Sequence, residues 1–148
     1  MGADEPRPVG CQICRADVTT VVMVLERSGI PPGEPGHAIA YSHTMMVRCG
    51  TCGGGTIEVR DYDSFDYEEV IDQYEWYICD TDSCDRLVSM ATACPRSLDP
   101  ACDCPVHQSL RIAVRRLPRR AWQFAIIEAN AHLHRVVVTV DGTIIIEE

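Results

Sequence analysis

Apolar and polar positions alternate in three segments within the first 60 residues. Residues 18–26 and 38–48 are rich in β-branched and other apolar side chains, and residues 56–60 alternate strictly between the two kinds. A period of two residues, bounded by Pro and Gly, is typical of β-strands. A stretch rich in Pro and Gly at residues 28–36 separates the first two segments. The pattern therefore predicts three strands, the first two of which are joined by a loop.

The pattern is less regular in the middle of the chain. Residues 65–75 mix apolar and acidic side chains, and we interpret them as a short helix. Apolar runs at residues 76–78 and 87–90 indicate two further short strands. Residues 94–105 contain three prolines and three cysteines, which indicates a loop. At residues 110–114 apolar side chains alternate with arginine or alanine, and this predicts another half-buried strand.

The last 30 residues show two stronger signals. Residues 121–133 contain many helix formers with apolar side chains at helical spacing, and Pro118 suits the first turn of such a helix. Residues 136–140 and 143–146 are both β-branched and flank the dipeptide Asp141-Gly142. Asp-Gly between two such runs favours a β-hairpin. We expect one C-terminal helix followed by a terminal hairpin, and a polar, disordered lead over residues 1–8.

Cysteine is the unusual component of the composition. The chain has nine cysteines among 148 residues, and an odd number cannot all pair as disulfides. No apolar run is long enough for a transmembrane helix, and the first residues lack the features of a secretory signal. We therefore expect a cytoplasmic protein without a membrane segment. Because disulfides are rare in the cytoplasm, metal binding is the favoured explanation for the cysteines.

Two Cys-x-x-Cys pairs, Cys11/Cys14 and Cys49/Cys52, stand at either end of the first two predicted strands. Zinc takes four such ligands in a tetrahedron. Together with the strand that follows, residues 9–60 resemble a zinc ribbon, in which two cysteine turns meet at the base of a β-hairpin. The resemblance is to a type of fold and implies one zinc held by these four cysteines.

A second set of candidate ligands follows. Four ligands can come from Cys79, Cys84, Cys102 and Cys104, or His107 can replace one of the last two, which leaves Cys94 as the spare cysteine. Two alternatives stay open. A cross-braced arrangement would pair Cys11 and Cys14 with Cys79 and Cys84, and iron in place of zinc would suit the same sulfurs. The expected fold is α+β and mainly β, with the acidic segment, second cluster, helix and hairpin of residues 61–148 packed on the ribbon as one unit.

Charge is divided unevenly along the chain, whose net charge is −9. Residues 61–85 hold ten acidic side chains and no arginine, with several aromatics among them, whereas residues 105–135 hold six arginines and one glutamate. Lysine is absent, which we interpret as the bias of a GC-rich, bacterial-type genome. Two surfaces of opposite sign are typical of a protein with macromolecular partners. The candidate partner-binding residues are Asp61, Asp63, Asp66, Glu68, Glu69, Asp72, Arg115, Arg116, Arg119 and Arg120.

Three functions are compatible with these observations. The favoured one is a zinc-stabilised module without enzymatic activity, an adaptor or an inhibitor of the immunity-protein kind, whose acidic aromatic face binds a basic protein. The second is a nucleic-acid-binding zinc ribbon that uses residues 111–120, although a pI near 4.9 counts against it. The third is a thiol or redox enzyme with Cys94 as the nucleophile. No nucleotide-binding or hydrolase motif is present in the sequence.

Overall fold

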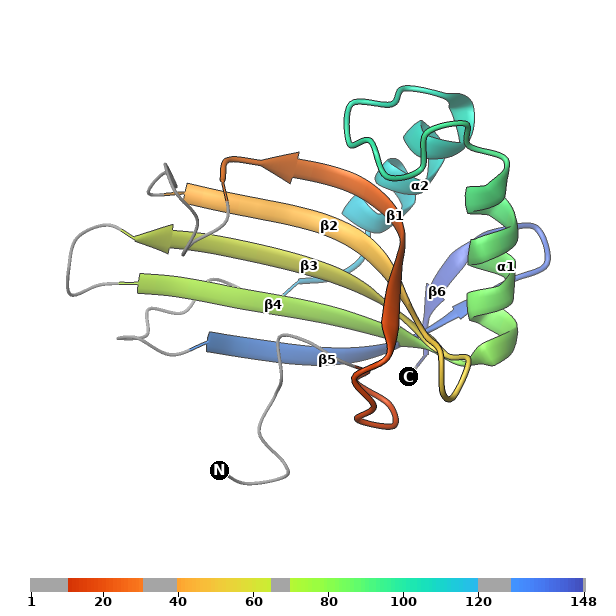
Figure 1. Ribbon diagram of the computed structural model, residues 1–148, viewed down its shortest axis with the longest axis horizontal. Coiled ribbons are helices and arrows are strands. Elements are labelled where there is room, and N and C mark those ends of the chain that lie inside the picture. Colours follow the sequence, from red (N-terminus) through yellow and green to blue (C-terminus); the bar gives the residue numbers. More distant parts are fainter. Residues whose placement is uncertain (1–10, 31–39, 65–69, 120–128, 148) are drawn as a thin grey trace.

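The computed structural model describes residues 11–30, 40–64, 70–119 and 129–147. They form six strands and two helices, which Figure 1 shows with both helices gathered at one end of a curved sheet. The elements, in chain order, are β1 (Thr19–Ser28), β2 (Ala40–Cys49), β3 (Gly55–Ser64), β4 (Val70–Cys79), α1 (Thr81–Thr92), α2 (Pro105–Arg115), β5 (Ala129–Val138) and β6 (Ile144–Ile146). The class is α+β and mainly β, as expected.

The strands lie in the sheet in the order in which they occur along the chain. β1 to β4 form an antiparallel meander, and the three strands predicted in the first 60 residues are confirmed as β1, β2 and β3. The chain then passes through both helices and returns as β5, which pairs with β4 in parallel. A parallel pair requires such a long crossover connection, because its strands run in the same direction.

One face of the sheet packs against the helices and holds the main core. Met23 and Met46, with Ile57 and Tyr77 in register beside them, meet Leu87 of α1 and Leu110 of α2 across this face. All six side chains are at most 3 % exposed. Burial of aliphatic and aromatic side chains on this scale is the dominant favourable contribution to folding.

Two predicted strands are helices in the structure. Residues 87–90 belong to α1, where the buried Ser83, Cys84, Leu87 and Ala91 recur at helical spacing. The Asp80 carboxylate caps this helix by accepting a hydrogen bond from the Ser83 amide at 2.8 Å. Residues 110–114 belong to α2, on which Leu110 and Val114 are buried but Ile112 is 48 % exposed. The alternation over residues 110–114 is too short to distinguish a strand from a helix, and these residues belong to a helix that begins at Pro105.

Two predicted helices are wrong where the structure describes them. Residues 70–75 lie in β4, and residues 129–133 lie in β5. The rest of both predicted segments, residues 65–69 and 120–128, is outside the described residues, as are residues 1–8. The terminal hairpin is confirmed: Val138 of β5 pairs with Ile144 of β6 across the Asp141-Gly142 turn.

The other face of the sheet carries a hydrogen-bonded polar network. The Glu58 carboxylate accepts hydrogen bonds from the indole N–H of Trp76 (2.9 Å) and contacts His43 Nε2 (2.7 Å). The other imidazole nitrogen of His43 contacts the Tyr41 hydroxyl at 2.7 Å. Since Trp76 and Tyr41 are at most 3 % exposed, this network satisfies polar groups that burial would otherwise destabilise.

Candidate metal centres

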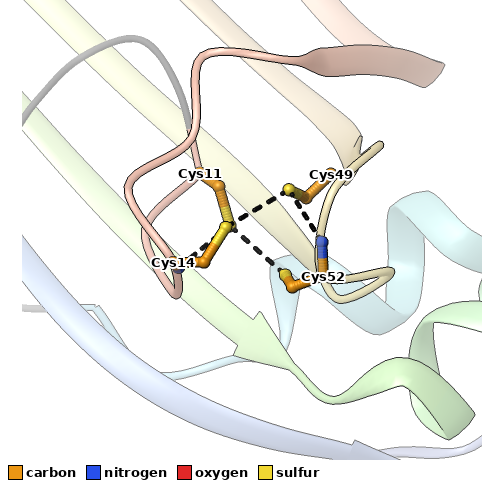
Figure 2. A group of neighbouring side chains, drawn as sticks. All are labelled: Cys11, Cys14, Cys49 and Cys52. Atoms are coloured by element: carbon orange, nitrogen blue, oxygen red, sulfur yellow. Dashed lines mark hydrogen bonds between the residues drawn. The ribbon is translucent and has the colours of Figure 1, made fainter.

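The first candidate centre lies where β1 begins and β2 ends. Cys11 and Cys14 come from the turn before β1, Cys49 ends β2, and Cys52 lies in the turn between β2 and β3 (Figure 2). All four sulfurs lie within 4.8 Å of one another. The sulfurs of Cys11 and Cys52 are 3.7 Å apart, and those of Cys14 and Cys49 are 3.5 Å apart.

These distances match a metal tetrahedron and exclude disulfides. Four sulfurs about 2.3 Å from one ion are about 3.8 Å apart, whereas the sulfurs of a disulfide are about 2.0 Å apart. All nine cysteines are free thiols in the structure. The antiparallel pairing of β1 with β2 places Thr19 opposite Cys49, and this register brings the two turns together.

The two turns have the same backbone geometry. In each, the residue after the second cysteine has a positive φ, 67° at Arg15 and 76° at Gly53, and its amide donates to the carbonyl of the first cysteine. The amides two and three positions after the first cysteine donate to its sulfur. These bonds run from Ile13 (3.3 Å) and Cys14 (3.5 Å) to Cys11, and from Thr51 (3.3 Å) and Cys52 (3.4 Å) to Cys49.

Amide donors favour the thiolate form that a metal requires. Backbone donation from Cys52 lowers the pKa of the Cys49 thiol to about 6. Desolvation has the opposite effect at Cys52, whose pKa is raised to about 12, and it also raises the pKa of Cys11. Cys49 thus ionises easily, whereas burial disfavours ionisation of Cys11 and Cys52. A bound cation would offset the free-energy cost of ionising these two buried thiols.

We expect Gly53→Ala to destabilise the metal-loaded protein by about 1–2 kcal/mol, because a side chain in the left-handed region costs that much. The added Cβ has room, since its nearest neighbour would be Thr81 at 3.4 Å, so the effect isolates the backbone conformation. The measurement is chemical denaturation with zinc in excess. Thr51→Ala in the same turn is the control, because the Thr51 side chain is exposed and only its amide contacts sulfur. Equal stabilities of the two variants would contradict this account of the turn.

The second candidate centre consists of Cys94, Cys102, Cys104 and His107, whose ligand atoms also lie within 4.8 Å of one another. Cys94 Sγ is central: it is 3.6 Å from Cys102 Sγ, 3.4 Å from Cys104 Sγ and 3.4 Å from His107 Nδ1. A sulfur and an imidazole nitrogen bound to one tetrahedral ion are about 3.6 Å apart. Three cysteines and one histidine therefore form a second closed tetrahedral set.

His107 is held in the orientation that a metal ligand needs. Its ring is fully buried in the first turn of α2, and Nε2 donates a hydrogen bond to the Val24 carbonyl at 2.8 Å. The proton is thereby fixed on Nε2, which leaves the Nδ1 lone pair facing Cys94. Cys104 caps the same helix, and its sulfur accepts from the His107 amide at 3.4 Å, which lowers the pKa of the Cys104 thiol.

This second set corrects the expected grouping. Cys94, the spare cysteine of the expected grouping, is a member, whereas Cys79 and Cys84 belong to neither centre. Cys79 ends β4 and Cys84 lies in α1, so both sulfurs point into the core beside Gly55 instead of into the loop. The grouping follows the order of the chain, so the cross-braced alternative, with Cys11 and Cys14 joined to Cys79 and Cys84, is also wrong.

The second centre fastens the helical part of the chain to β1, the edge strand of the sheet. Beside the bond from His107, the Val24 amide donates to the Ser97 carbonyl at 2.8 Å. The guanidinium of Arg111 donates to three carbonyls, those of Leu25 (2.7 Å), Pro100 (2.6 Å) and Cys102 (2.6 Å). An uncovered edge strand is prone to pair with other chains, and the loop around this centre covers part of it.

We expect Arg111→Ala to destabilise the protein by about 2 kcal/mol or more, because the loop carbonyls lose charge-assisted hydrogen bonds. Arg111→Lys should rescue little, since an ammonium lacks the planar fork that reaches several carbonyls. The control is Arg116→Ala, whose side chain is exposed at the end of the same helix and should change stability by less than about 0.5 kcal/mol. Denaturant unfolding measures the stability of all three variants. A loss of stability in Arg116→Ala as large as that in Arg111→Ala would contradict this role of Arg111.

Some of the charged residues that we expect to bind a partner form ion pairs within the protein, and others are exposed or half-buried. Asp72 forms a two-pronged ion pair with Arg60 (2.9 and 3.0 Å). Arg115 pairs with Glu26, while Arg116 and Arg119 are exposed. Asp61 and Asp63 are half-buried on β3. Asp66, Glu68, Glu69 and Arg120 lie outside the described residues.

Three aromatic side chains of the acidic segment are buried, whereas Tyr62 is half-buried. Tyr74, Trp76 and Tyr77 are all at most 3 % exposed, so these three cannot contact a partner. Cys94 is 7 % exposed, and desolvation raises its pKa to about 11. A buried thiol surrounded by other candidate metal ligands is unsuited to act as a nucleophile.

No protein-family model, curated protein or solved structure matches this chain. None of the helices in the described residues is long and apolar enough to cross a membrane. The fold and the two ligand sets thus define a mainly β protein with two clusters suited to metal ions.

Proposed function

We propose that both centres bind zinc and that the two ions hold the fold together without catalysing a reaction. The observation that carries this proposal is that each cluster has four protein ligands. Catalytic zinc keeps one position open for water or substrate, whereas structural sites are closed by four ligands. The donor set of the second centre favours zinc over iron, since three cysteines and one histidine are a common set for structural zinc. The sequence left the choice between these metals open.

The same proposal assigns the chain a role as a module that binds a macromolecular partner. The net charge of −9 favours a basic partner. The exposed acidic side chain of Asp82, in the first turn of α1, supports this choice. Nucleic acid is the weaker candidate, because Arg111 and Arg115 of the arginine-rich segment are engaged within the protein. An adaptor or inhibitor role fits a small metal-stabilised chain of this charge.

The metal part is tested by native mass spectrometry with elemental analysis of the untagged protein. Two zinc ions per chain are expected. Iron in either site, or fewer than two tightly held ions, would refute the metal assignment.

The partner part is tested separately with defined probes on the zinc-loaded protein. We expect a short arginine-rich peptide to bind, more weakly as salt increases, and duplex DNA not to bind at low salt. Asp82→Asn should weaken peptide binding, whereas Asp141→Asn, an equal charge change in the turn between β5 and β6 where the carboxylate already bonds to Thr139 and Thr143, should have little effect. Binding of DNA in preference to the peptide would overturn this choice of partner while leaving the zinc assignment intact.

A further inference from the structure

A third group of metal-ligating side chains lies on β4 and β5, away from both cysteine clusters. Along β5, Val136 and Val138 are buried in the core while Val137 and Leu133 on the opposite side are exposed. Because side chains alternate along a strand, His132 and His134 continue the inward-facing row. On β4, Glu75 stands directly across from His132, and Tyr77 stands across from His134. Both histidines and the glutamate therefore share one face of a parallel strand pair.

The contacts within this group are close. His134 Nε2 lies 2.5 Å from Glu75 Oε2, with 19 % and 2 % of the two side chains exposed. The Tyr77 ring stacks on the His134 ring, with centroids 4.9 Å apart and planes 16° from parallel. The Tyr77 hydroxyl donates to the Pro118 carbonyl at 2.7 Å, so the ring that supports His134 is itself fixed. The stacking limits rotation of the His134 ring and keeps it beside Glu75.

His132 supplies an independent observation. Its Nε2 atom is buried and has no hydrogen-bond partner in the part of the chain that the structure describes. Buried polar nitrogens are almost always satisfied, because leaving one without a partner costs free energy. His132 Nε2 lacks a hydrogen-bond partner, and its strand neighbours include the buried carboxylate of Glu75 and a second imidazole. A metal ion would supply the missing partner.

We propose that His132, His134 and Glu75 bind a third, exchangeable divalent metal ion. The 2.5 Å contact between His134 and Glu75 must lengthen to about 3 Å for both to ligate one ion, and the ligand atoms of the three residues do not all lie within 4.8 Å of one another. Metal binding therefore turns the His132 ring toward Glu75. The spacing of neighbouring strands, about 4.8 Å, allows this by rotation of the side chain alone. Three protein ligands leave positions open for water or a small anion, unlike the two closed centres. Two imidazoles and a carboxylate bind Zn²⁺ as well as Mn²⁺, Fe²⁺ and Co²⁺, so zinc beyond two ions per chain must be removed before another metal is tested.

The test uses the protein with both cysteine centres loaded with zinc. It is titrated with Mn²⁺, which thiolates do not select, and free Mn²⁺ is counted by electron paramagnetic resonance. One bound Mn²⁺ per chain is expected while the zinc content stays at two. Glu75→Gln and His132→Ala should each weaken Mn²⁺ binding at least tenfold without loss of zinc.

A matched control exists on the opposite face of the sheet. Glu58 and His43 form a similar pair, 2.7 Å apart, whose third neighbour is the Tyr41 hydroxyl instead of a second histidine. Glu58→Gln should therefore leave Mn²⁺ binding unchanged. Failure of the zinc-loaded protein to bind Mn²⁺, or equal losses in Glu75→Gln and Glu58→Gln, would overturn the proposal. Neither result bears on the two zinc centres, whose occupancy is counted in the same samples.

Discussion

Cys49→Ser is expected to abolish metal binding at the first centre and to leave the protein largely unfolded at room temperature. Binding of a structural zinc contributes about 10–16 kcal/mol in small zinc domains, which exceeds the net stability of about 5–15 kcal/mol of most domains. Cys49 ends β2 and groups with cysteines from the turns before β1 and before β3, so loss of the ion removes the link between these two turns. Circular dichroism during heating, combined with a zinc count, measures both effects.

Cys84→Ser is the matched control for this prediction. Cys84 and Cys49 are equally buried, each 3 % exposed, but Cys84 lies in α1 outside both clusters. The same change of sulfur to oxygen should here cost only about 1–3 kcal/mol, the penalty of a poorly paired buried hydroxyl. The zinc content should remain two per chain. If Cys49→Ser instead kept two zinc ions and melted at the temperature of Cys84→Ser, the first centre would have no structural role.

Cys94→Ser should reduce the zinc content from two ions to one and release the segment between α1 and α2 from the edge of the sheet. Cys94 contacts each of the other three ligands of the second centre, so no closed set remains without it. The Val24 amide, which donates to Ser97 in this segment, should then exchange its hydrogen at least tenfold faster. Hydrogen exchange followed by mass spectrometry measures the exchange rate of this amide in β1.

The control for Cys94→Ser is Cys79→Ser. Cys79 was an expected ligand that the structure places in the core, where its thiol donates to the Gly55 carbonyl at 3.4 Å. A serine hydroxyl can donate to the same carbonyl, so two zinc ions and slow exchange at Val24 should both persist. Loss of one zinc in Cys79→Ser but not in Cys94→Ser would restore the grouping expected from the sequence.

The first half of the fold could be predicted because its signals are local. Alternation marks β1 to β3, and two Cys-x-x-Cys pairs at the ends of a strand pair point to one ion. The helices α1 and α2 were missed because short windows such as residues 87–90 and 110–114 contain too few positions to separate a period of two from one of 3.6. The capping residues Asp80 and Cys104 were the available signals for where these helices start.

The second centre was only partly predictable. Cys102, Cys104 and His107 were identified from their spacing, but the choice between Cys94 and the Cys79/Cys84 pair depends on where the end of α1 directs the chain. If residues 81–92 had been predicted as a helix, Cys84 would have been assigned to the buried face of that helix and not to the ligand set. The pairing of His132 with Glu75 could not be predicted, because parallel pairing of β4 with β5 joins residues more than 50 positions apart. Such register is determined by tertiary packing and not by local pattern.

X-ray absorption at the zinc edge of the purified, dialysed protein tests the central claim most directly, because it counts ligand types as well as ions. The two centres together offer seven sulfurs and one imidazole nitrogen. The expected spectrum is a sulfur shell at about 2.3 Å with a minor nitrogen contribution at about 2.0 Å. A first shell made mainly of nitrogen and oxygen, or a protein that retains no zinc after dialysis, would contradict the assignment of both clusters.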